Sequence, residues 1–465
     1  MSRKISRRRF LQAGSVSAAA AGFWLSGGVT ESFAAQPGAN ERLNIAMIGC
    51  GGQGGGYNPK TQRYSGDLAG VHQENIVALC DVDENRARST FDHYPRVTKY
   101  TDFRQMLDKQ KDIQAVVVAT PDHIHFHASA TAIRMGKHVY CEKPLTHSVW
   151  EARQLRELAA KHKVATQMGN QGTSNSGLRY GVELIRSGAI GDVTEVHVWT
   201  NRPIWPQGNA ALEARMKGSR EVPKTLNWDL WLGPASDRPY NAAYAPFAWR
   251  GWWDFGTGAL GDMGCHTMNL PYMGLRLGAP TSISADVEGK VHAETAPVGC
   301  TITYEFPARP AAKTPAPSSA AMPACRLFWY ERRRPPMDLL QGIQVGGSGC
   351  LIVGSRGKIY TASDYGDGIR LLPQGDVRAY PLPSPSLPRS PGHHAEWIRA
   401  CKGGVPAMSN FDYAGPLTEM VLLGNVAIRV GRRINWDSAK LQAIDLPAAN
   451  QYIRRTYRKG WEWNG

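Results

Sequence analysis

A glycine-rich segment directly after an apolar run limits what this chain can fold into more than any other feature. Residues 43–48 are mostly apolar, and the pattern Gly49-x-Gly51-x-x-Gly54 follows at once. Such a loop after a buried strand is typical of dinucleotide-binding folds, because glycines permit a tight turn and let backbone N–H groups approach a pyrophosphate. We therefore predict cofactor contacts from Gly49, Gly51, Gly52, Gln53 and Gly54.

The next apolar run ends at an acidic residue, Asp81. A carboxylate in this place accepts hydrogen bonds from the adenosine ribose and repels a 2′-phosphate, which favours NAD over NADP. Arg86 lies close enough in sequence to weaken that preference, so NADP is the alternative. The interval from Gly54 to Asp81 exceeds the usual ~20 residues, and residues 57–73 are therefore predicted to be an insertion.

Residues 41–170 alternate between short apolar runs and helical patterns. The runs are continuous, as in a parallel sheet that is covered on both faces. We predict an α/β Rossmann domain with a doubly wound parallel sheet. The predicted strands are 43–48, 76–80, 115–119, 138–141 and 164–168, and the predicted helices are 102–110, 126–135 and a segment that begins with a capping box at Ser148.

The pattern changes after residue 170, where several runs alternate or carry β-branched residues. We predict that residues 171–465 form an α+β domain with a largely antiparallel, open-faced sheet, which binds substrate and mediates homo-oligomerisation. Its last helices are free to pack back on the Rossmann domain. The predicted strands are 193–200, 282–288, 299–306, 325–330, 350–354, 358–362 and 369–372, and the predicted helices are 176–187, 394–402 and 416–431.

The first 34 residues predict an exported protein. Three arginines at 7–9 precede Phe10-Leu11, a weakly apolar stretch follows, and Ser32-Phe33-Ala34 fits a cleavage site. Consecutive arginines before Phe-Leu are typical of a twin-arginine signal peptide, which delivers folded proteins; an ordinary secretory signal or an uncleaved anchor is the alternative. We expect a periplasmic or otherwise exported protein that meets the twin-arginine translocase during export.

Composition narrows the classes of partner. The formal net charge is +15, yet the basic residues are spread along the chain, so we predict no nucleic-acid partner. Eight cysteines in an exported protein suggest disulfides at first. Cys50 lies in the glycine loop, however, and Cys80 and Cys141 end apolar strands. Because these are buried positions, we expect mostly free thiols.

Two further segments carry residue types suited to proton transfer. Glu142-Lys143-Pro144 ends a predicted strand, and ligands bind at the carboxyl ends of parallel strands. A lysine there can exchange a proton near neutral pH, with Glu142 to orient it. Asp262 and His266 are four residues apart on a predicted helix, so the carboxylate can fix the imidazole. The alternatives are an ordinary strand end, and a capping aspartate with a core histidine.

Residues after other strands complete the predicted cofactor site. Thr120, Pro121 and His125 follow the strand that ends at residue 119, and they should border the cofactor. Asn170 follows the last strand of the domain. It is placed to reach the nicotinamide or the substrate, and we include it in the cofactor site together with Glu142.

The predicted substrate contacts are weaker. Gln171 follows Asn170, Arg179 on the next helix can bind an acidic or hydroxylated substrate, and Trp253 is one of four tryptophans that flank the segment with Asp262. Tryptophan faces stack on sugar rings but also fill cores. We predict no metal site, because the alternating histidines within residues 123–127 begin a helix and have no companion cysteine or carboxylate cluster.

Together these features resemble the Gfo/Idh/MocA family, which includes glucose-fructose oxidoreductase and inositol dehydrogenase. The resemblance runs from about residue 43 to the C-terminus. The matching residues are Gly49 to Gly54, Asp81, Thr120-Pro121 with His125, Glu142-Lys143-Pro144, and Asp262 with His266. It implies hydride transfer between a nicotinamide cofactor and a hydroxyl-bearing carbon of a sugar, glycoside or cyclitol. By this resemblance Lys143 and His266 act on the substrate hydroxyl, and Asp262 supports them.

Export and a nicotinamide cofactor together imply a tightly bound cofactor, because no free pool exists outside the cytoplasm. The enzyme would then reoxidise its NAD(H) with a second sugar or with an external acceptor. One alternative is an NAD-dependent glycoside hydrolase that works by transient oxidation, elimination and re-reduction, without net redox change. A second alternative is a non-catalytic sugar-binding protein, against which Lys143, Asp262 and His266 argue.

Overall fold

The computed structural model describes residues 42–311, 320–340, 342–373 and 384–463. The predicted leader, residues 1–34, lies outside them, as do parts of the two predicted proline-rich connections. Among the helices within the described ranges, none has the length and apolar character that crossing a membrane requires.

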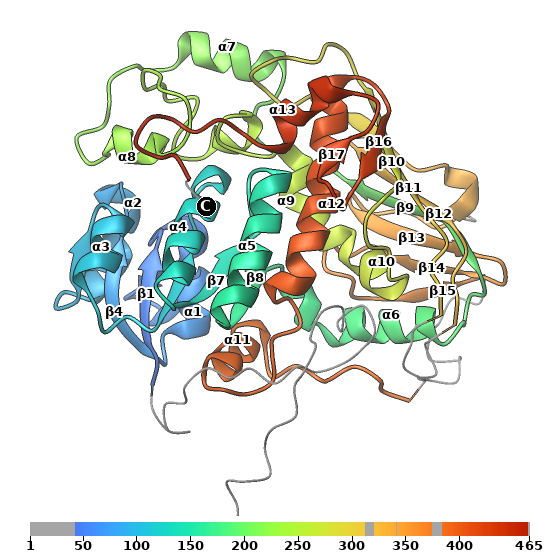
Figure 1. The fold of residues 1–465 in the computed structure, drawn as a ribbon, viewed down its shortest axis with the longest axis horizontal. Coiled ribbons are helices and arrows are strands. Elements are labelled where there is room, and N and C mark those ends of the chain that lie inside the picture. Colours follow the sequence, from blue (N-terminus) through green and yellow to red (C-terminus); the bar gives the residue numbers. More distant parts are fainter. Residues whose placement is uncertain (1–41, 312–319, 341, 374–383, 464–465) are drawn as a thin grey trace, which may run out of the picture.

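A six-stranded, fully parallel sheet forms the N-terminal half of the fold (Figure 1). Its strand order is β5-β4-β1-β6-β7-β8, so the chain runs outward in both directions from β1, and the predicted doubly wound sheet is confirmed. The strands are β1 (Asn44–Ile48), β4 (Asn75–Cys80), β5 (Thr98–Tyr100), β6 (Ala115–Val118), β7 (His138–Glu142) and β8 (Thr166–Gly169).

Side-chain caps fix where several helices of this domain begin. Asp83 caps α2, Asp102 caps α3, and Ser148 with Glu151 forms the predicted capping box of α5. Helix α4 begins four residues before the prediction, because Pro121 occupies its N-cap position and Asp122 already lies in the first turn. The helices are α2 (Glu84–His93), α3 (Phe103–Lys109), α4 (Asp122–Arg134) and α5 (Val149–His162).

The segment predicted as an insertion separates the glycine loop from the first helix. A 3₁₀ turn, η2 (Gly52–Gly54), is followed by a hairpin of β2 (Gly56–Asn58) and β3 (Arg63–Ser65). Only then does the short helix α1 (Gly66–Val71) begin. This helix packs against η2 and against α11 (His393–Cys401), which lies far along the chain.

A nine-stranded mixed sheet forms the second half, and all its pairs are antiparallel except β9 with β12. The predicted largely antiparallel sheet is thereby confirmed. Its strands, in spatial order, are β15 (Arg370–Leu372), β14 (Lys358–Thr361), β13 (Gly349–Gly354), β9 (Val193–Thr200), β12 (Cys325–Glu331), β11 (Cys300–Phe306), β10 (Ser282–Val287), β16 (Ile434–Asp437) and β17 (Gln442–Ala443).

The second face of this sheet is partly covered by the chain itself. Trp199, Tyr330 and Tyr360 form a buried cluster there with Leu340 from the connection after β12. The homo-oligomer expected from an open sheet face stays a prediction.

Helix α12 (Phe411–Val430) joins the two halves (Figure 1). It packs on α5, on α9 (Gly258–Thr267) and on strands β10 and β11. It is buried on nearly all sides, as a helix that is apolar all round must be. It also holds a bidentate ion pair, in which Arg153 of α5 contacts both carboxylate oxygens of Glu419 at 2.8 Å. The helix begins five residues before the prediction because Asn410 caps it.

The remaining helices surround these layers, and the C-terminal ones pack on the Rossmann domain through α5, β8 and α1. They are α6 (Ser176–Arg186), α7 (Asn209–Lys217), α8 (Trp228–Leu232), α9 (Gly258–Thr267), α10 (Asn269–Gly274), α11 (His393–Cys401) and α13 (Asn450–Ile453), with 3₁₀ turns η3 (Gln171–Ser174), η4 (Ala248–Gly251), η5 (Met337–Leu340) and η7 (Pro447–Ala449). All eight cysteines are buried and unpaired.

Arg179 lies in the core rather than in a binding site. It is completely buried, its Nε donates to the Thr173 carbonyl at 3.0 Å, and its Nη1 donates to the Pro388 carbonyl. Nη2 pairs with Glu396 of α11, which is also buried. These contacts tie α6 to α11, and the predicted role of Arg179 in substrate binding is not supported because its guanidinium is enclosed.

We predict that Arg179→Ala strongly destabilises the protein, because it leaves the Glu396 carboxylate buried and unpaired. The free energy of unfolding, measured in guanidinium chloride, should fall by about 3–5 kcal/mol. Lys111→Ala is the control: its ion pair with Asp108 is exposed and should contribute less than ~1 kcal/mol. Equal effects of the two substitutions would contradict this role for Arg179.

The three alternating histidines of α4 are all buried, but each contacts a different segment. His123 lies between the Phe255 carbonyl (Nδ1, 3.1 Å) and the Trp231 carbonyl (Nε2, 2.9 Å). His127 contacts the Trp461 carbonyl at 2.8 Å. Burial lowers the pKa of His123 to about 3 and that of His127 to about 4, so both rings are neutral in the folded protein.

We therefore predict acid-sensitive stability. Below about pH 6.5 the unfolded chain protonates these histidines whereas the folded chain does not, so the free energy of unfolding falls with pH down to the folded-state pKa values. His123→Gln should reduce this slope by about 1.4 kcal/mol per pH unit. The check is denaturant unfolding across the acidic range; an unchanged slope would show that His123 is not neutral when buried.

Candidate active site

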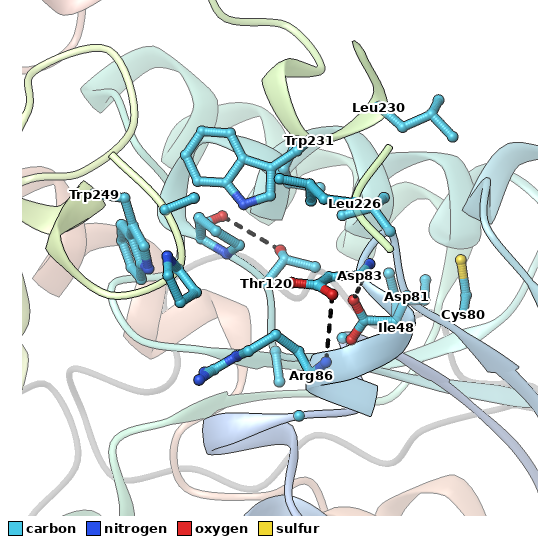
Figure 2. Close-up of a pocket in the computed structure, with 18 of the residues that line it drawn as sticks. Ile48, Cys80, Asp81, Asp83, Arg86, Thr120, Leu226, Leu230, Trp231 and Trp249 are labelled. Carbon is cyan, nitrogen blue, oxygen red and sulfur yellow. Dashed lines mark hydrogen bonds between the residues drawn. The ribbon is translucent and has the colours of Figure 1, made fainter. Parts of the chain in front are cut away.

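A cavity of about 240 Å³ lies at the carboxyl edge of the parallel sheet. Residues at the ends of β1, β4, β6 and β7 line one side, and residues 223–250 of the second half line the other. Figure 2 shows Leu226 and Trp231 across the cavity from Arg86. The predicted site residues that it brings together are Gly49, Gly51, Gln53, Asp81, Thr120, Pro121, Glu142 and Lys143.

The glycine loop is packed so closely that side chains cannot replace its glycines. Gly49 has a φ of +87°, and a Cβ there would lie 2.5 Å from the Ala119 carbonyl oxygen. A Cβ on Gly51 would lie 2.4 Å from the Arg86 carbonyl oxygen. The loop is therefore held against β6 and α2, with its backbone at the cavity wall, as a bound pyrophosphate requires.

Asp81 fixes this loop from the end of β4. One carboxylate oxygen accepts the Cys50 N–H at 2.8 Å and the other accepts the Asp83 N–H at 2.9 Å, while burial raises the pKa of the carboxyl. Each oxygen keeps a second lone pair for a ribose hydroxyl. The Arg86 guanidinium lies over Gly52, where a Cβ would be 2.7 Å from Nη2. A carboxylate and a cation on either side of the glycine loop fit a dinucleotide.

Lys143 lies at the other end of the cavity, in a buried ion-pair network. Its Nζ donates to Asp262 Oδ1 at 2.8 Å, and Arg250 Nε lies 3.3 Å from the same oxygen. Burial alone would raise the pKa of Asp262, but Lys143 and Arg250 hold it well below its usual range. The network places an ammonium donor at the end of β7 and keeps its partner ionised.

His266 does not form the predicted pair with Asp262. The carboxylate is turned toward Lys143 and Arg250, and His266 Nδ1 has no hydrogen-bond partner within the part of the chain that the structure describes. The ring packs edge-on against Tyr365, with centroids 4.9 Å apart. Burial, reinforced by the charge of Lys143, lowers the pKa of His266 to about 3, so the imidazole is neutral.

Arg250 and Asp122 belong to the same network, although neither was predicted as a site residue from the sequence. Asp122 Oδ1 accepts from Arg250 Nη1 at 3.0 Å. Its Oδ2 accepts from the backbone N–H and the hydroxyl of Thr257 at 3.1 and 2.6 Å. Asp122 stands next to the predicted Thr120-Pro121 segment, which was a usable signal, but Arg250 lies in the irregular turn η4, which has no recognisable pattern.

Three predicted residues support the site from behind its wall. His125 joins two loops, with Nδ1 at 2.8 Å from the Pro144 carbonyl and Nε2 at 2.8 Å from the Thr120 carbonyl. Asn170 is buried and bonds the Cys265 carbonyl and the Ser409 hydroxyl. Gln171 donates to Glu142 Oε1 at 3.1 Å. Their contacts orient the cavity residues, and Gly52 and Gly54 likewise shape the loop without lining the cavity.

Of the four tryptophans that flank the segment with Asp262, Trp249 lines the cavity and Trp253 does not. Trp253 is buried, and its indole N–H donates to the His292 carbonyl at 3.3 Å. Trp249 and Trp231 line the cavity instead (Figure 2), and the Arg250 guanidinium lies 4.3 Å from the Trp249 ring centroid. Among the described side chains, no group of three or more His, Cys, Asp or Glu residues is arranged to hold a metal ion.

Two family models match this chain. Residues 43–170 match the oxidoreductase family with an NAD-binding Rossmann fold, and residues 204–308 match the C-terminal alpha/beta domain of the same family. Inositol 2-dehydrogenase of Salmonella typhimurium is 27% identical over 157 residues, which are 33% of this chain and 45% of that protein. The enzyme of the same name from Serratia proteamaculans is 32% identical over 162 residues, 35% and 46% of the two chains. The chain thus matches less than half the length of these relatives.

Solved structures share the fold across both halves. The WlbA dehydrogenase of Bordetella pertussis, in complex with NADH and UDP-GlcNAcA, superposes with a TM-score of 0.58 at 16% identity, covering 86% of this chain and 99% of that one. Aldose-aldose oxidoreductase of Caulobacter crescentus, complexed with glycerol, gives 0.53 at 15% identity, covering 85% and 100%. With the glycine loop, the strand-end residues and both family models in agreement, this chain belongs to the Gfo/Idh/MocA family of NAD-binding oxidoreductases.

Proposed function

We propose that the protein is an exported oxidoreductase that transfers a hydride between a tightly held NAD and a hydroxyl-bearing carbon of a sugar, glycoside or cyclitol. One observation carries the proposal: the Lys143 ammonium, paired with Asp262 at 2.8 Å, lies in the same cavity as the glycine loop. The names of the relatives and structural neighbours refer to inositol and to aldoses, and one neighbour was solved with a nucleotide sugar. These names support the proposed substrate class.

Bound NAD supplies the hydride acceptor or donor. The protein's part is to hold a proton at the substrate oxygen. When the carbonyl is reduced, the Lys143 ammonium donates a proton to the carbonyl oxygen. When the alcohol is oxidised, the ammonium first gives up a proton to solvent, and the neutral amine then takes the hydroxyl proton. Asp262, itself held by Arg250, keeps the ammonium aimed into the cavity. His266 is neutral and one helical turn from Asp262, where it can hydrogen-bond the same substrate oxygen.

A strap across the ribose end of the cavity supports tight retention of the cofactor. Residues 223–231 pair with the loop after β4: the Asn227 N–H donates to the Val82 carbonyl at 2.8 Å, and the Glu84 N–H donates to the Thr225 carbonyl at 3.0 Å. Leu226, within this strap, lines the cavity. A dinucleotide beneath the strap cannot leave without breaking these bonds. Retention suits an enzyme exported with its cofactor by the twin-arginine leader that residues 7–11 suggest.

We expect purified protein to release NAD(H) on denaturation, and to change nicotinamide absorbance when mixed with one member of a panel of sugars, cyclitols and glycosides. Net reduction supports the dehydrogenase. Aglycone release without net reduction would instead assign the transient-oxidation glycoside hydrolase. Protein that binds no nucleotide and turns over no member of the panel would contradict the proposal.

Lys143→Ala should retain nucleotide but lose at least ~10²-fold in turnover, because no lysine side chain then remains to transfer the proton at the substrate oxygen. Lys137→Ala, which removes a half-buried lysine that lies before the same strand and does not line the cavity, is the control and should behave as the native protein. Unchanged turnover in Lys143→Ala would remove Lys143 from the chemistry.

Leu226→Ala should weaken the strap and increase the rate at which bound nucleotide is lost during dialysis. We expect roughly a tenfold change, since truncating a buried leucine side chain typically costs 2 kcal/mol or more. Val222→Ala alters an exposed side chain on the same segment and should leave retention unchanged. Equal retention in both variants would mean that the strap does not hold the cofactor.

A further inference from the structure

A buried pair of carboxyl groups lies behind the chemical end of the cavity. Asp67 comes from α1, after the inserted hairpin, and is 0% exposed; Glu142 ends β7 and is 3% exposed. The two side chains are close enough to interact directly. Glu142 accepts hydrogen bonds from Gln171, Gln53 and its neighbour's backbone N–H, whereas Asp67 Oδ2 has no partner among the described residues.

The space that the pair and its neighbours occupy depends on two nearby glycines, Gly169 and Gly70. A Cβ on Gly169 would lie 2.2 Å from Glu142 Oε1, and a Cβ on Gly70 would lie 2.2 Å from the His394 ring. His394 of α11 in turn lies with Nε2 3.1 Å from Asp67 Oδ1. Three elements that are far apart in sequence, α1, β7 and α11, therefore enclose the two carboxyl groups.

Two carboxylates in such a site do not both ionise easily. Burial raises the pKa of Asp67 to about 7, and burial together with the Asp67 charge raises that of Glu142 to about 8. The pair therefore titrates as a unit around neutral pH. The other charged or titratable groups around it fall into three kinds. Lys143 and Arg250 are cations that favour its ionisation, burial raises the pKa of Tyr140, Cys141 and Tyr365, and burial lowers the pKa of His394 to about 4.

The pair lies at the nicotinamide end of the site. Glu142 lines the cavity beside Lys143, and β7 stands on the opposite side of β1 from β4, which carries Asp81. A dinucleotide with its ribose at Asp81 and its pyrophosphate at the glycine loop extends toward β7. The oxidised nicotinamide ring carries a positive charge and the reduced ring does not, so a change of charge on the pair acts on the two forms differently.

We propose that the Asp67–Glu142 carboxyl pair sets the redox balance of the bound NAD through its own protonation. When the pair loses a proton it favours NAD⁺ over NADH, and when the ring is reduced the pair takes a proton from solvent. The hydride and the hydroxyl proton of the substrate follow the path already described. This inference rests on the NAD part of the proposed function and is independent of which sugar is the substrate.

The test is an exchange equilibrium that needs no substrate. The protein is incubated to equilibrium with NAD⁺/NADH mixtures of fixed ratio, and the bound nucleotide is then separated, released and quantified. The bound NAD⁺/NADH ratio should rise roughly tenfold or more between about pH 6 and about pH 9, because the pair gains negative charge across that range. A bound ratio constant within about twofold would overturn the proposal.

Asp67→Asn keeps the size of the side chain but removes one titrating group. In this variant the change in the bound NAD⁺/NADH ratio with pH should be smaller and should occur at lower pH, because the Asp67 charge no longer raises the pKa of Glu142. Glu74→Gln is the matched control: Glu74 follows α1 and pairs with Lys402 of α11 at 2.7 Å, away from the cavity, and should keep the native profile. A native profile in Asp67→Asn would also overturn the proposal.

If Asp67→Asn fails to fold, the pH profile of the native protein is sufficient to test the proposal. Lys143→Ala tests whether the neighbouring lysine causes the effect. In this variant the pH-dependent change in the bound NAD⁺/NADH ratio should persist and move to higher pH, because Lys143 lowers the pKa of both carboxyl groups. Loss of this pH dependence in Lys143→Ala would assign the effect to the lysine and contradict the pair. Absence of sugar turnover would contradict the proposed function and leave this measurement unaffected.

Discussion

The ion pair between Lys143 and Asp262 is the contact on which the site depends. It joins the end of β7 in the Rossmann domain to α9 in the second half, across 119 residues of sequence. Both groups are largely buried, and the Lys143 ammonium needs the Asp262 carboxylate as its counter-charge, whereas Asp262 is also held by Arg250. The relative position of the two halves therefore determines whether this ion pair forms, and with it the proton transfer that we propose for Lys143.

Helix α12 supplies the rigidity that this contact requires. It packs simultaneously on α5, α9 and the large sheet, and its buried residues leave no face for solvent. Because α9 carries both Asp262 and His266, the packing of α9 against α12 fixes the positions of both side chains. The strap at residues 223–231 lies at the other end, over Asp83, so the cofactor retention and the proton transfer that we propose depend on separate parts of the second half.

Sequence patterns predicted those strands and site residues that short stretches of sequence determine. The apolar runs located five of the six parallel strands, whereas β5 (Thr98–Tyr100) was missed because it is a short edge strand without a buried residue. Lys143 and Asp262 were found through their motifs. Their mutual contact, and the parts of Arg250, Asp122 and Asp67, were not, because irregular or inserted segments bring these groups together only through tertiary packing.

The most direct test of the proposed hydride transfer follows deuterium from the substrate carbon to the nicotinamide ring. The protein with its bound nucleotide is incubated with a sugar or cyclitol that carries deuterium on its carbinol carbons, and the released nucleotide is examined by mass spectrometry. The account predicts deuterium on the nicotinamide ring with the native protein and its loss in Lys143→Ala. Unlabelled nucleotide after turnover of a deuterated substrate would show that no hydride passes between the two, and would contradict the account.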